Sequence, residues 1–361
     1  MAARCGRPAN NDWFRALFGF RELDYAYDDV QGKFELLNDA TVLRSTVNGK
    51  AYTIGTFECM SLGALRSAGR DTAVGGETTV RHEASRDVFL DHCDTNNKDA
   101  LFQAASQLNC LEFMSPRCVP EQGVTRYNRD LTQGPACAIA AGPGTVYRNY
   151  FVPVGGRTGQ TATSQVNNLD DVQAMLANDV HKYFDVVNGY TDSTSRQLGK
   201  LNTTVLCDDS MRGKLSDAIK IGLHWNVQVP FVARYMPVAA TRPIHCVSQA
   251  YCSAISVGYS AASARDWAPF AKLVLEASYE ATLWAGVLNY QRTGCNKVFL
   301  TAVGGGVFGN ATEWIVDAIA SAVAAVARCG LDVVLVHYRR VDESFQRDLA
   351  VALNRKGAGH L

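Results

Sequence analysis

The segment that decides the fold reads Lys297-Val298-Phe299-Leu300-Thr301-Ala302-Val303-Gly304-Gly305-Gly306-Val307-Phe308-Gly309-Asn310. Its apolar start predicts a buried strand over residues 297–301, and the glycines predict a loop directly after it. The apolar pattern from Trp314 to Arg328 predicts a helix, and residues 332–337 predict a second strand. Strand, loop, helix and strand form a βαβ unit, which indicates an α/β fold with a parallel sheet and helices on its faces.

The glycine loop, residues 304–310, has the properties of an anion-binding turn. Glycine lets the backbone approach a ligand closely and adopt positive φ. Free N–H groups at a helix start, together with the helix dipole, favour a diphosphate. Phe308 is placed to pack on a ribose or base, and Asn310 to cap the helix or donate to a phosphate oxygen. The alternative is a tight turn without a ligand, which does not need so many glycines.

Composition indicates a globular protein without a general affinity for nucleic acids. Hydrophobic residues make up 47% of the 361 positions, which is enough for a sizeable core and argues against disorder. Lys+Arg and Asp+Glu are each 35, so the net charge is zero. The basic bias of many nucleic-acid-binding proteins is absent, and we expect no direct nucleic-acid binding.

The cysteines and histidines show no metal-ligand spacing, so we expect no metal site. There are 11 Cys without a C-x-x-C pair and seven His without a ligand pattern. Reduced thiols fit a cytoplasmic location, with the nucleus as the alternative. No apolar run of signal-peptide or membrane-spanning type occurs, so we expect no membrane partner.

The rest of the chain is divided into a cap and one main domain. Residues 1–50 are expected to form an N-terminal helical cap, and residues 51–361 the main domain, with an insertion at about 155–235. Residues 55–58 read as a turn, 88–90 as a short strand, and Trp267 to Leu288 as a long helix.

Two segments resemble the macrodomain superfamily. Residues 298–310, with the helix and strand that follow, are similar to the family's last strand, phosphate loop, helix and strand, in the style of poly(ADP-ribose) glycohydrolases. Asp99-Ala100-Leu101-Phe102-Gln103-Ala104-Ala105-Ser106 is similar to the macrodomain strand Asp-Ala-Ile-Val-Asn-Ala-Ala-Asn. The chain also resembles MavL-like ADP-ribosyl hydrolases, which remove ADP-ribose from ubiquitin. The resemblance implies a three-layer α/β/α fold with a mixed central sheet.

The resemblance also assigns ligand-binding positions, with ADP-ribose as ligand or product and no cofactor. The glycine loop (Gly304, Gly305, Gly306, Val307, Phe308, Gly309, Asn310) would hold the diphosphate. By their order along the chain, Phe57 and Glu58 would grip adenine. Gln103, Ser106, Gln133 and Gly134 would lie near the distal ribose, and Cys252 and Ser253 would follow the penultimate strand.

The catalytic acid is harder to assign, because the glycohydrolase signature of a glycine triplet followed by paired glutamates is absent from the expected place. Releasing ADP-ribose needs an acid for the leaving group or a base to activate water. Asp170 and Asp171 are adjacent carboxylates that raise each other's pKa, and Glu276 lies on the long helix. The alternatives are an acidic helix start for the pair and a solvated or ion-paired face for Glu276.

Three functions remain open at this stage. The first is an ADP-ribosyl hydrolase acting on a modified protein side chain, with arginine-linked ubiquitin as a candidate. The second is a reader module that holds ADP-ribose without turnover. The third is an interaction scaffold with a vestigial pocket. A correctly placed acid separates the first from the others.

Overall fold

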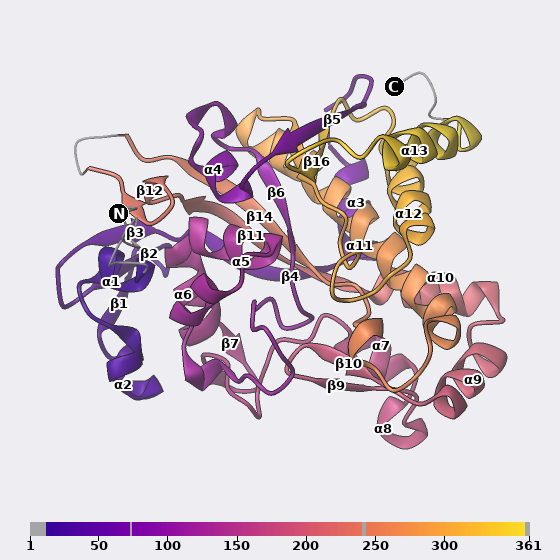
Figure 1. The fold of residues 1–361 in the computed structure, drawn as a ribbon, viewed down its shortest axis with the longest axis horizontal. Coiled ribbons are helices and arrows are strands. Elements are labelled where there is room, and N and C mark those ends of the chain that lie inside the picture. Colours follow the sequence, from indigo (N-terminus) through magenta and orange to yellow (C-terminus); the bar gives the residue numbers. More distant parts are fainter. Residues whose placement is uncertain (1–11, 73, 240–242, 358–361) are drawn as a thin grey trace, which may run out of the picture.

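The structure is a computed structural model that describes residues 12–72, 74–239 and 243–357. Seven strands form one mixed sheet in the order β4-β11-β14-β6-β15-β16-β5 (Figure 1). Their bounds are β4 (Thr56–Ser61), β5 (Thr79–Ser85), β6 (Leu101–Ala105), β11 (Lys220–Gln228), β14 (Cys246–Cys252), β15 (Lys297–Leu300) and β16 (Asp332–Tyr338). The strands from β14 to β5 run parallel, whereas β11 is antiparallel to both neighbours. The βαβ unit predicted from the glycine segment is confirmed, because β15 and β16 pair in parallel.

Helices cover both faces of this sheet. One layer contains α3 (Leu62–Arg70), α11 (Ala264–Thr293) and α12 (Thr312–Ala325), with α13 (Glu343–Arg355) packed on α12. The other layer contains α4 (Val88–Cys93), α5 (Gln133–Ala140) and α6 (Gly142–Tyr150). The expected three-layer α/β/α fold with a mixed central sheet is confirmed, and α11 is the long helix predicted from the sequence.

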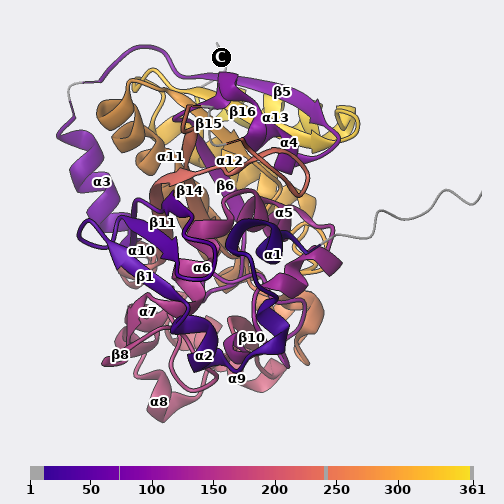
Figure 2. The same cartoon turned by 90° about the vertical axis from the view of Figure 1, so that its left-hand side faces the viewer.

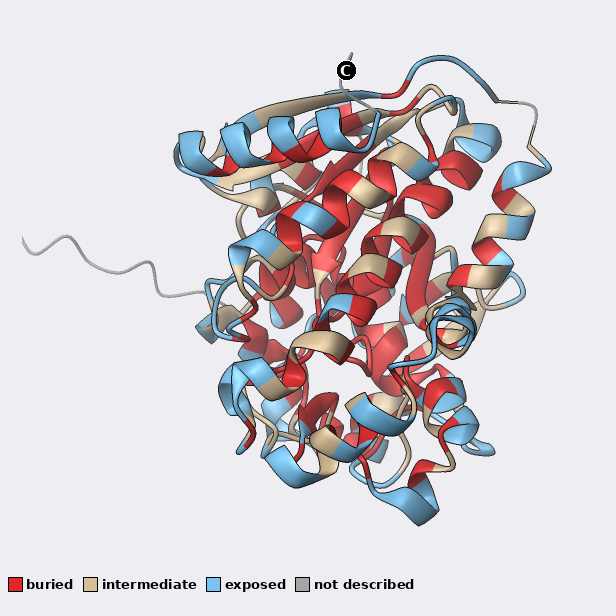
Figure 3. Cartoon of the chain, turned by 90° about the vertical axis from the view of Figure 1, so that its right-hand side faces the viewer, coloured by how far each residue is buried: buried red, intermediate tan, exposed pale blue. Residues whose placement is uncertain are grey.

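The core lies on both sides of the parallel strands, which explains why these strands read as continuous apolar runs. Leu101 and Val298 face α11 and its neighbours. On the opposite face, Phe102 stacks on Phe299 with ring centroids 4.3 Å apart. Figure 3 shows buried residues filling this interior, with exposed residues on the outer sides of the helices. The strand ends are therefore held rigidly where the glycine loop begins.

The N-terminal segment covers the α5–α6 layer (Figure 2). It contains α1 (Trp13–Phe18), a 3-10 turn η1 (Glu22–Asp24), α2 (Tyr27–Gln31), and the small sheet β1 (Phe34–Leu37), β2 (Val42–Ser45) and β3 (Ala51–Thr53). Buried Glu22 ties it to the body, since its carboxylate accepts hydrogen bonds from the N–H groups of Val124 and Thr125. The cap predicted for residues 1–50 thus includes strands as well as helices, and its first 11 residues lie outside the described part.

The middle of the chain contributes mostly peripheral elements. They are β7 (Pro153–Val154), β8 (Arg157–Thr158), α7 (Asp170–Met175), α8 (Asn178–His181), β9 (Asp185–Val187), β10 (Tyr190–Asp192), α9 (Ser195–Thr204) and α10 (Asp209–Ala218). The insertion predicted for about 155–235 includes residues 220–228, but these residues form β11 inside the sheet. A hairpin, β12 (Phe231–Ala233) and β13 (Met236–Pro237), and short 3-10 turns η2 (Thr95–Asn97), η3 (Pro120–Gln122), η4 (Thr125–Arg129) and η5 (Val257–Tyr259) complete the fold.

Two local predictions are wrong, each for a physical reason. Residues 88–90 begin helix α4 rather than a strand, because the Asp87 side chain caps the helix by accepting from the N–H of Phe89. Residues 56–58 belong to β4, where pairing with β11 continues the sheet, and Gly55 alone makes the turn at a φ of +59°.

Candidate functional site

A cleft opens where the parallel strands β6 and β15 end. It has a volume of about 210 Å³. Its lining comes from the segment after β6, the start of α5, and the glycine loop after β15. Carboxyl ends of parallel strands are the usual place for ligands in open α/β sheets, because the loops there are free to vary while the strands position them.

The glycine loop forms one wall of the cleft, with Gly304, Gly306, Val307 and Phe308 lining it. Gly304 has a φ of +76°, and a Cβ there would collide with Ala254, so the position requires glycine. Three N–H groups are used internally, those of Gly305, Gly309 and Asn310. The N–H groups of the four lining residues have no hydrogen-bond acceptor among the residues that the structure describes.

Asn310 fixes the shape of this loop and does not cap the following helix. Its side-chain Nδ2 donates to the carbonyl oxygens of Ile255, at 2.9 Å, and of Gly304, at 3.3 Å. Helix α12 begins after Ala311 without a side-chain cap. The predicted role of Asn310 as a helix cap is therefore wrong, because its amide is turned back into the loop.

Aromatic rings stand beside the glycine loop. The ring centroid of Phe308 lies 5.5 Å from that of Tyr190 and 5.8 Å from that of Tyr259. All three residues line the cleft. The hydroxyl of Tyr190 donates to the carbonyl oxygen of Phe113 at 2.6 Å, which fixes its ring across the opening. This apolar wall suits the face of a sugar or a base.

The start of helix α5 forms the opposite wall and is tied to strand β6. The Gln133 side chain accepts from the N–H of Ala105 at 2.8 Å and donates to the carbonyl oxygen of Gln103 at 2.7 Å. Gly134 follows, and a Cβ there would overlap the Ala105 carbonyl and a carboxylate oxygen of Glu112. Glycine is therefore needed at 134 so that Glu112 fits against the helix.

Glu112 is the most unusual titratable group in the cleft. Its side chain is fully buried, and neither carboxylate oxygen meets hydrogen-bond geometry with a described residue, although the Ser106 hydroxyl lies close enough to affect it. Its backbone is held in place, because its N–H donates to the Tyr127 hydroxyl at 2.9 Å. Burial raises the pKa of Glu112 well above its ordinary value, and Ser106 and the charge of Arg148 oppose this only in part. Burial therefore favours the protonated form of Glu112, which is the form able to donate a proton.

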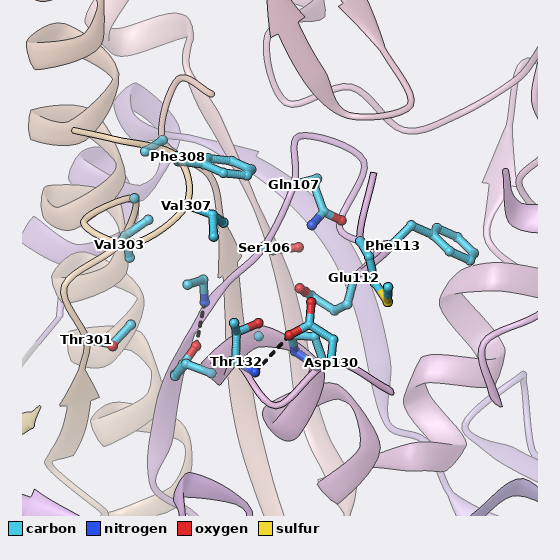
Figure 4. Close-up of a pocket in the computed structure, with 18 of the residues that line it drawn as sticks. Ser106, Gln107, Glu112, Phe113, Asp130, Thr132, Thr301, Val303, Val307 and Phe308 are labelled. Carbon is cyan, nitrogen blue, oxygen red and sulfur yellow. Dashed lines mark hydrogen bonds between the residues drawn. The ribbon is translucent and has the colours of Figure 1, made fainter. Parts of the chain in front are cut away.

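Figure 4 shows how these groups face one another. Glu112 and Asp130 lie on one side of the pocket, with Val307 and Phe308 of the glycine loop on the other. Asp130 is anchored by the N–H of Thr132, which donates to its carboxylate at 2.9 Å. The cleft thus combines unused backbone donors on one wall with a buried acid of raised pKa on the other.

The comparisons with known proteins give matches among solved structures alone. No family model and no curated protein matches the chain. Poly(ADP-ribose) glycohydrolase from Thermomonospora curvata is similar at a TM-score of 0.43 and 12% identity, over 85% of this chain and 91% of that one. The Deinococcus radiodurans glycohydrolase in complex with ADP-ribose is similar at 0.43 and 13%, over 83% and 93%. Its apo form is similar at 0.39 and 12%, over 83% and 91%.

The structure brings several of the predicted ligand-binding residues to the cleft. Ser106, Gln133 and Gly134 line it together with the four glycine-loop residues. Gln103 does not, because its buried amide accepts from the N–H of Thr301 and donates to Thr282. It joins the ends of β6 and β15 instead.

Cys252 and Ser253 are also buried outside the lining. The Cys252 thiol lies near the Ala104 carbonyl and the Thr282 hydroxyl, and burial raises its pKa to about 12. The Ser253 hydroxyl donates to the carbonyl oxygen of Ala254 at 2.8 Å. Both positions support the loop after β14, and Ala254 is the residue that reaches the cleft.

Phe57 and Glu58, predicted to grip adenine, lie on β4 in another cavity. Glu58 accepts from the indole N–H of Trp225 at 2.7 Å. The Phe57 ring packs beside His224 with centroids 5.5 Å apart. The two cavities have no lining residue in common, so this pair does not act on a ligand held by the glycine loop.

The three predicted catalytic carboxylates are also placed elsewhere, which corrects that assignment. Asp170 and Asp171 are half-exposed and both pair with Lys220, at 2.9 and 2.8 Å. Glu276 lies on the outer side of α11, facing the charges of Arg212, Lys272 and Lys356. None of the three lines the cleft.

Sequence reasoning missed Glu112, although a signal was present. It stands in Cys110-Leu111-Glu112-Phe113-Met114, shortly after the strand that resembles the macrodomain motif. A single carboxylate between apolar residues is rarely fully buried without a partner, so such a position is a candidate for chemistry.

Within the described ranges, no cluster of three or more His, Cys, Asp or Glu side chains is arranged to hold a metal ion. His360 and Cys5 lie outside those ranges. No helix in the described part combines the length and the apolar character needed to cross a membrane.

Proposed function

We propose that this chain is an ADP-ribosyl hydrolase that releases ADP-ribose from a modified protein side chain, with Glu112 as the proton donor. The observation that carries the proposal is the pairing, in one cleft, of free backbone N–H groups with a buried carboxyl group that has no partner. The first arrangement suits a diphosphate. The second suits the cleavage of a glycosidic bond, and the sequence resemblance to macrodomains connects the two in ADP-ribose.

The diphosphate lies over the glycine loop in this proposal. The N–H groups of Gly304, Gly306, Val307 and Phe308 are free to donate to its oxygens. Backbone donors of this kind bind anions without an arginine or lysine, because they form a concave group of partial positive charges. The distal ribose then reaches past Phe308 toward Glu112.

The adenosine end fits a neighbouring cavity that shares Thr301 and Ala302 with the cleft. This cavity follows the end of β16 and is lined by His337, Tyr338 and Phe345. Tyr338 is 70% exposed, and the Arg339 guanidinium lies 4.9 Å from its ring centroid, so a base would stack on the other face of the ring. A ligand that crosses the glycine loop thus has an aromatic site at one end and the acid at the other.

Glu112 performs the chemistry by giving its proton to the leaving atom of the modified side chain as the bond to the anomeric carbon breaks. The resulting carboxylate then takes a proton from the water that attacks this carbon. The raised pKa of Glu112, which burial causes, keeps it protonated until this step. Catalysis therefore needs one carboxyl group that alternates between acid and base.

The modified side chain and the target protein rest on the sequence resemblance. Arginine-linked ADP-ribosyl ubiquitin is the first substrate to test. A cytoplasmic location, with the nucleus as the alternative, matches such a target. The reader module is the second candidate, but a reader has no need for a buried acid without a partner.

The experiment is incubation of the purified chain with ubiquitin carrying arginine-linked ADP-ribose and with a protein carrying glutamate-linked ADP-ribose, followed by intact-mass measurement. Loss of the modification from either substrate supports the hydrolase. Tight calorimetric binding of ADP-ribose without loss identifies the reader. Neither binding nor release, at millimolar ligand, would reject the cleft as an ADP-ribose site and favour a scaffold.

A further inference from the structure

Two cysteines lie together under a cavity that the proposed reaction does not use. Cys59 is on edge strand β4, half-buried, and lines the cavity that also contains Phe57 and Lys220. Cys110 is fully buried in the segment that leads to Glu112. Its φ of +59° is unusual for a residue other than glycine, so the chain is held there by its surroundings.

The sheet register brings the two sulfur atoms side by side. Cys59 is the cross-strand partner of Gly222 on β11, so both positions face the same side of the sheet. The Sγ atom of Cys110 fills the space above Gly222 so closely that a Cβ at 222 would collide with it. The Cys59 and Cys110 thiols are close enough in this arrangement for each to shift the pKa of the other.

A buried positive charge lies beside Cys110. Arg148 is fully buried, and no carboxylate within the described residues forms an ion pair with it. Its guanidinium donates to the Cys110 carbonyl oxygen at 3.0 Å and to the Thr145 hydroxyl at 3.0 Å, and stacks on Tyr251. A buried guanidinium needs a compensating charge, and the Cys110 sulfur is a nearby group able to carry one.

The contacts of Cys110 favour a thiolate. The Asn168 side-chain amide donates to its Sγ at 3.4 Å. Burial by itself disfavours the charge, but the hydrogen bonds from Cys59 and Asn168 and the charge of Arg148 hold the pKa of Cys110 below its ordinary value. The hydrogen bond to Cys110, together with burial, raises the pKa of Cys59. Of the two thiols, Cys110 thus has the lower pKa and Cys59 the higher.

We propose that Cys59 and Cys110 form a reversible oxidation site that a peroxide converts to a disulfide. Cys59 faces the cavity, and once its proton has passed to the Cys110 thiolate, the Cys59 thiolate attacks one oxygen of hydrogen peroxide. The O–O bond breaks, hydroxide leaves and is protonated by solvent, and Cys59 becomes a sulfenic acid. The Cys110 sulfur then attacks the Cys59 sulfur, its proton leaves with the hydroxyl as a second water, and the S–S bond forms.

This proposal does not depend on the hydrolase activity. Peroxide is reduced to water and two thiols are oxidised, so no other reactant is needed. Two other buried thiols are the internal comparison, because Cys137 and Cys252 have no hydrogen-bonded thiol partner in the described structure and burial raises the pKa of each.

The test is peptide mapping of the folded chain after brief treatment with hydrogen peroxide. Free thiols are blocked with an alkylating reagent under denaturing conditions before digestion. The expected product is a Cys59–Cys110 linked peptide that is lighter by two hydrogen atoms and disappears with dithiothreitol, while Cys137 and Cys252 are alkylated. Cys59→Ser should give no linked peptide, with its folding verified by circular dichroism.

Two results would overturn the proposal. One is full alkylation of both Cys59 and Cys110 in the treated wild-type chain. The other is a Cys59 oxidised to sulfinic acid while Cys110 remains a free thiol, since that would mean that the second sulfur cannot reach the first. Both results come from the wild-type protein, so they hold even if a variant folds poorly.

Discussion

Replacing Glu112 by glutamine tests the central residue through stability as well as activity. In the unfolded chain this carboxyl ionises above its ordinary pKa of 4.5, whereas in the folded chain burial keeps it protonated. Its stabilising contribution is complete below pH 4.5 and is lost as the pH rises toward the folded pKa. The loss amounts to about 1.4 kcal/mol per pH unit within that window.

Glutamine does not titrate, so Glu112→Gln lacks this loss. Between about pH 5 and about pH 7 the stability of the variant should rise relative to the wild type, by at most about 3 kcal/mol. The cost of placing an amide at this site is the same at both pH values and cancels in the comparison. Denaturant unfolding of both proteins at a series of pH values measures the difference.

The same substitution should lower the hydrolysis rate by about 10² to 10⁴-fold, the usual contribution of a general acid. Binding of ADP-ribose, measured by calorimetry, should remain, because the glycine loop is untouched. Two outcomes would refute the reasoning: parallel stability curves for the two proteins across the pH range, or hydrolysis by Glu112→Gln at the wild-type rate.

Four further substitutions have defined outcomes. Gly134→Ala should lower both thermal stability and hydrolysis, because its Cβ would overlap Ala105 and Glu112; a melting curve and a rate check this. Gly304→Ala should cost about 1–3 kcal/mol from its left-handed backbone and weaken ADP-ribose binding in calorimetry. The double variant Asp170→Ala, Asp171→Ala should hydrolyse the substrate within a factor of about 2 of the wild-type rate, since exposed ion pairs contribute little to stability. A tenfold lower rate would mean that these carboxylates take part in the reaction. Glu22→Gln should cost about 1–3 kcal/mol in denaturant unfolding without changing kcat, because an amide N–H would face the N–H of Val124 or Thr125.

The fold could be predicted where local pattern decides structure. The segment from β15 to β16 alternates a buried strand, glycines, an apolar helix and a second buried strand, and each step has its own sequence signal. Residues 88–90 lacked such a signal over their short length, and the decisive contact was a cap from Asp87.

The acid could not be predicted in the same way, because its properties come from contacts distant in sequence. Glu112 is buried by Gly134 and held by Tyr127, and neither contact is visible in the residues around it. Asp170 and Asp171 looked catalytic because adjacent carboxylates repel, but Lys220 neutralises that repulsion from another element. The glycine loop could be recognised from the sequence because its proposed anion binding depends on the absence of side chains, which the residue types show directly.

The hydrogen bonds of Gln133 also determine how the cleft can move. Its side chain makes two hydrogen bonds with the backbone of β6, as a neighbouring strand would. Helix α5 and the strand therefore form one rigid unit. On the facing side, Asn310 and Gly258 anchor both ends of the loop and leave the tip at Val307, which is 65% exposed. Because Val307 is exposed and lines the cleft, the rate of product departure should respond to the size of the side chain at position 307.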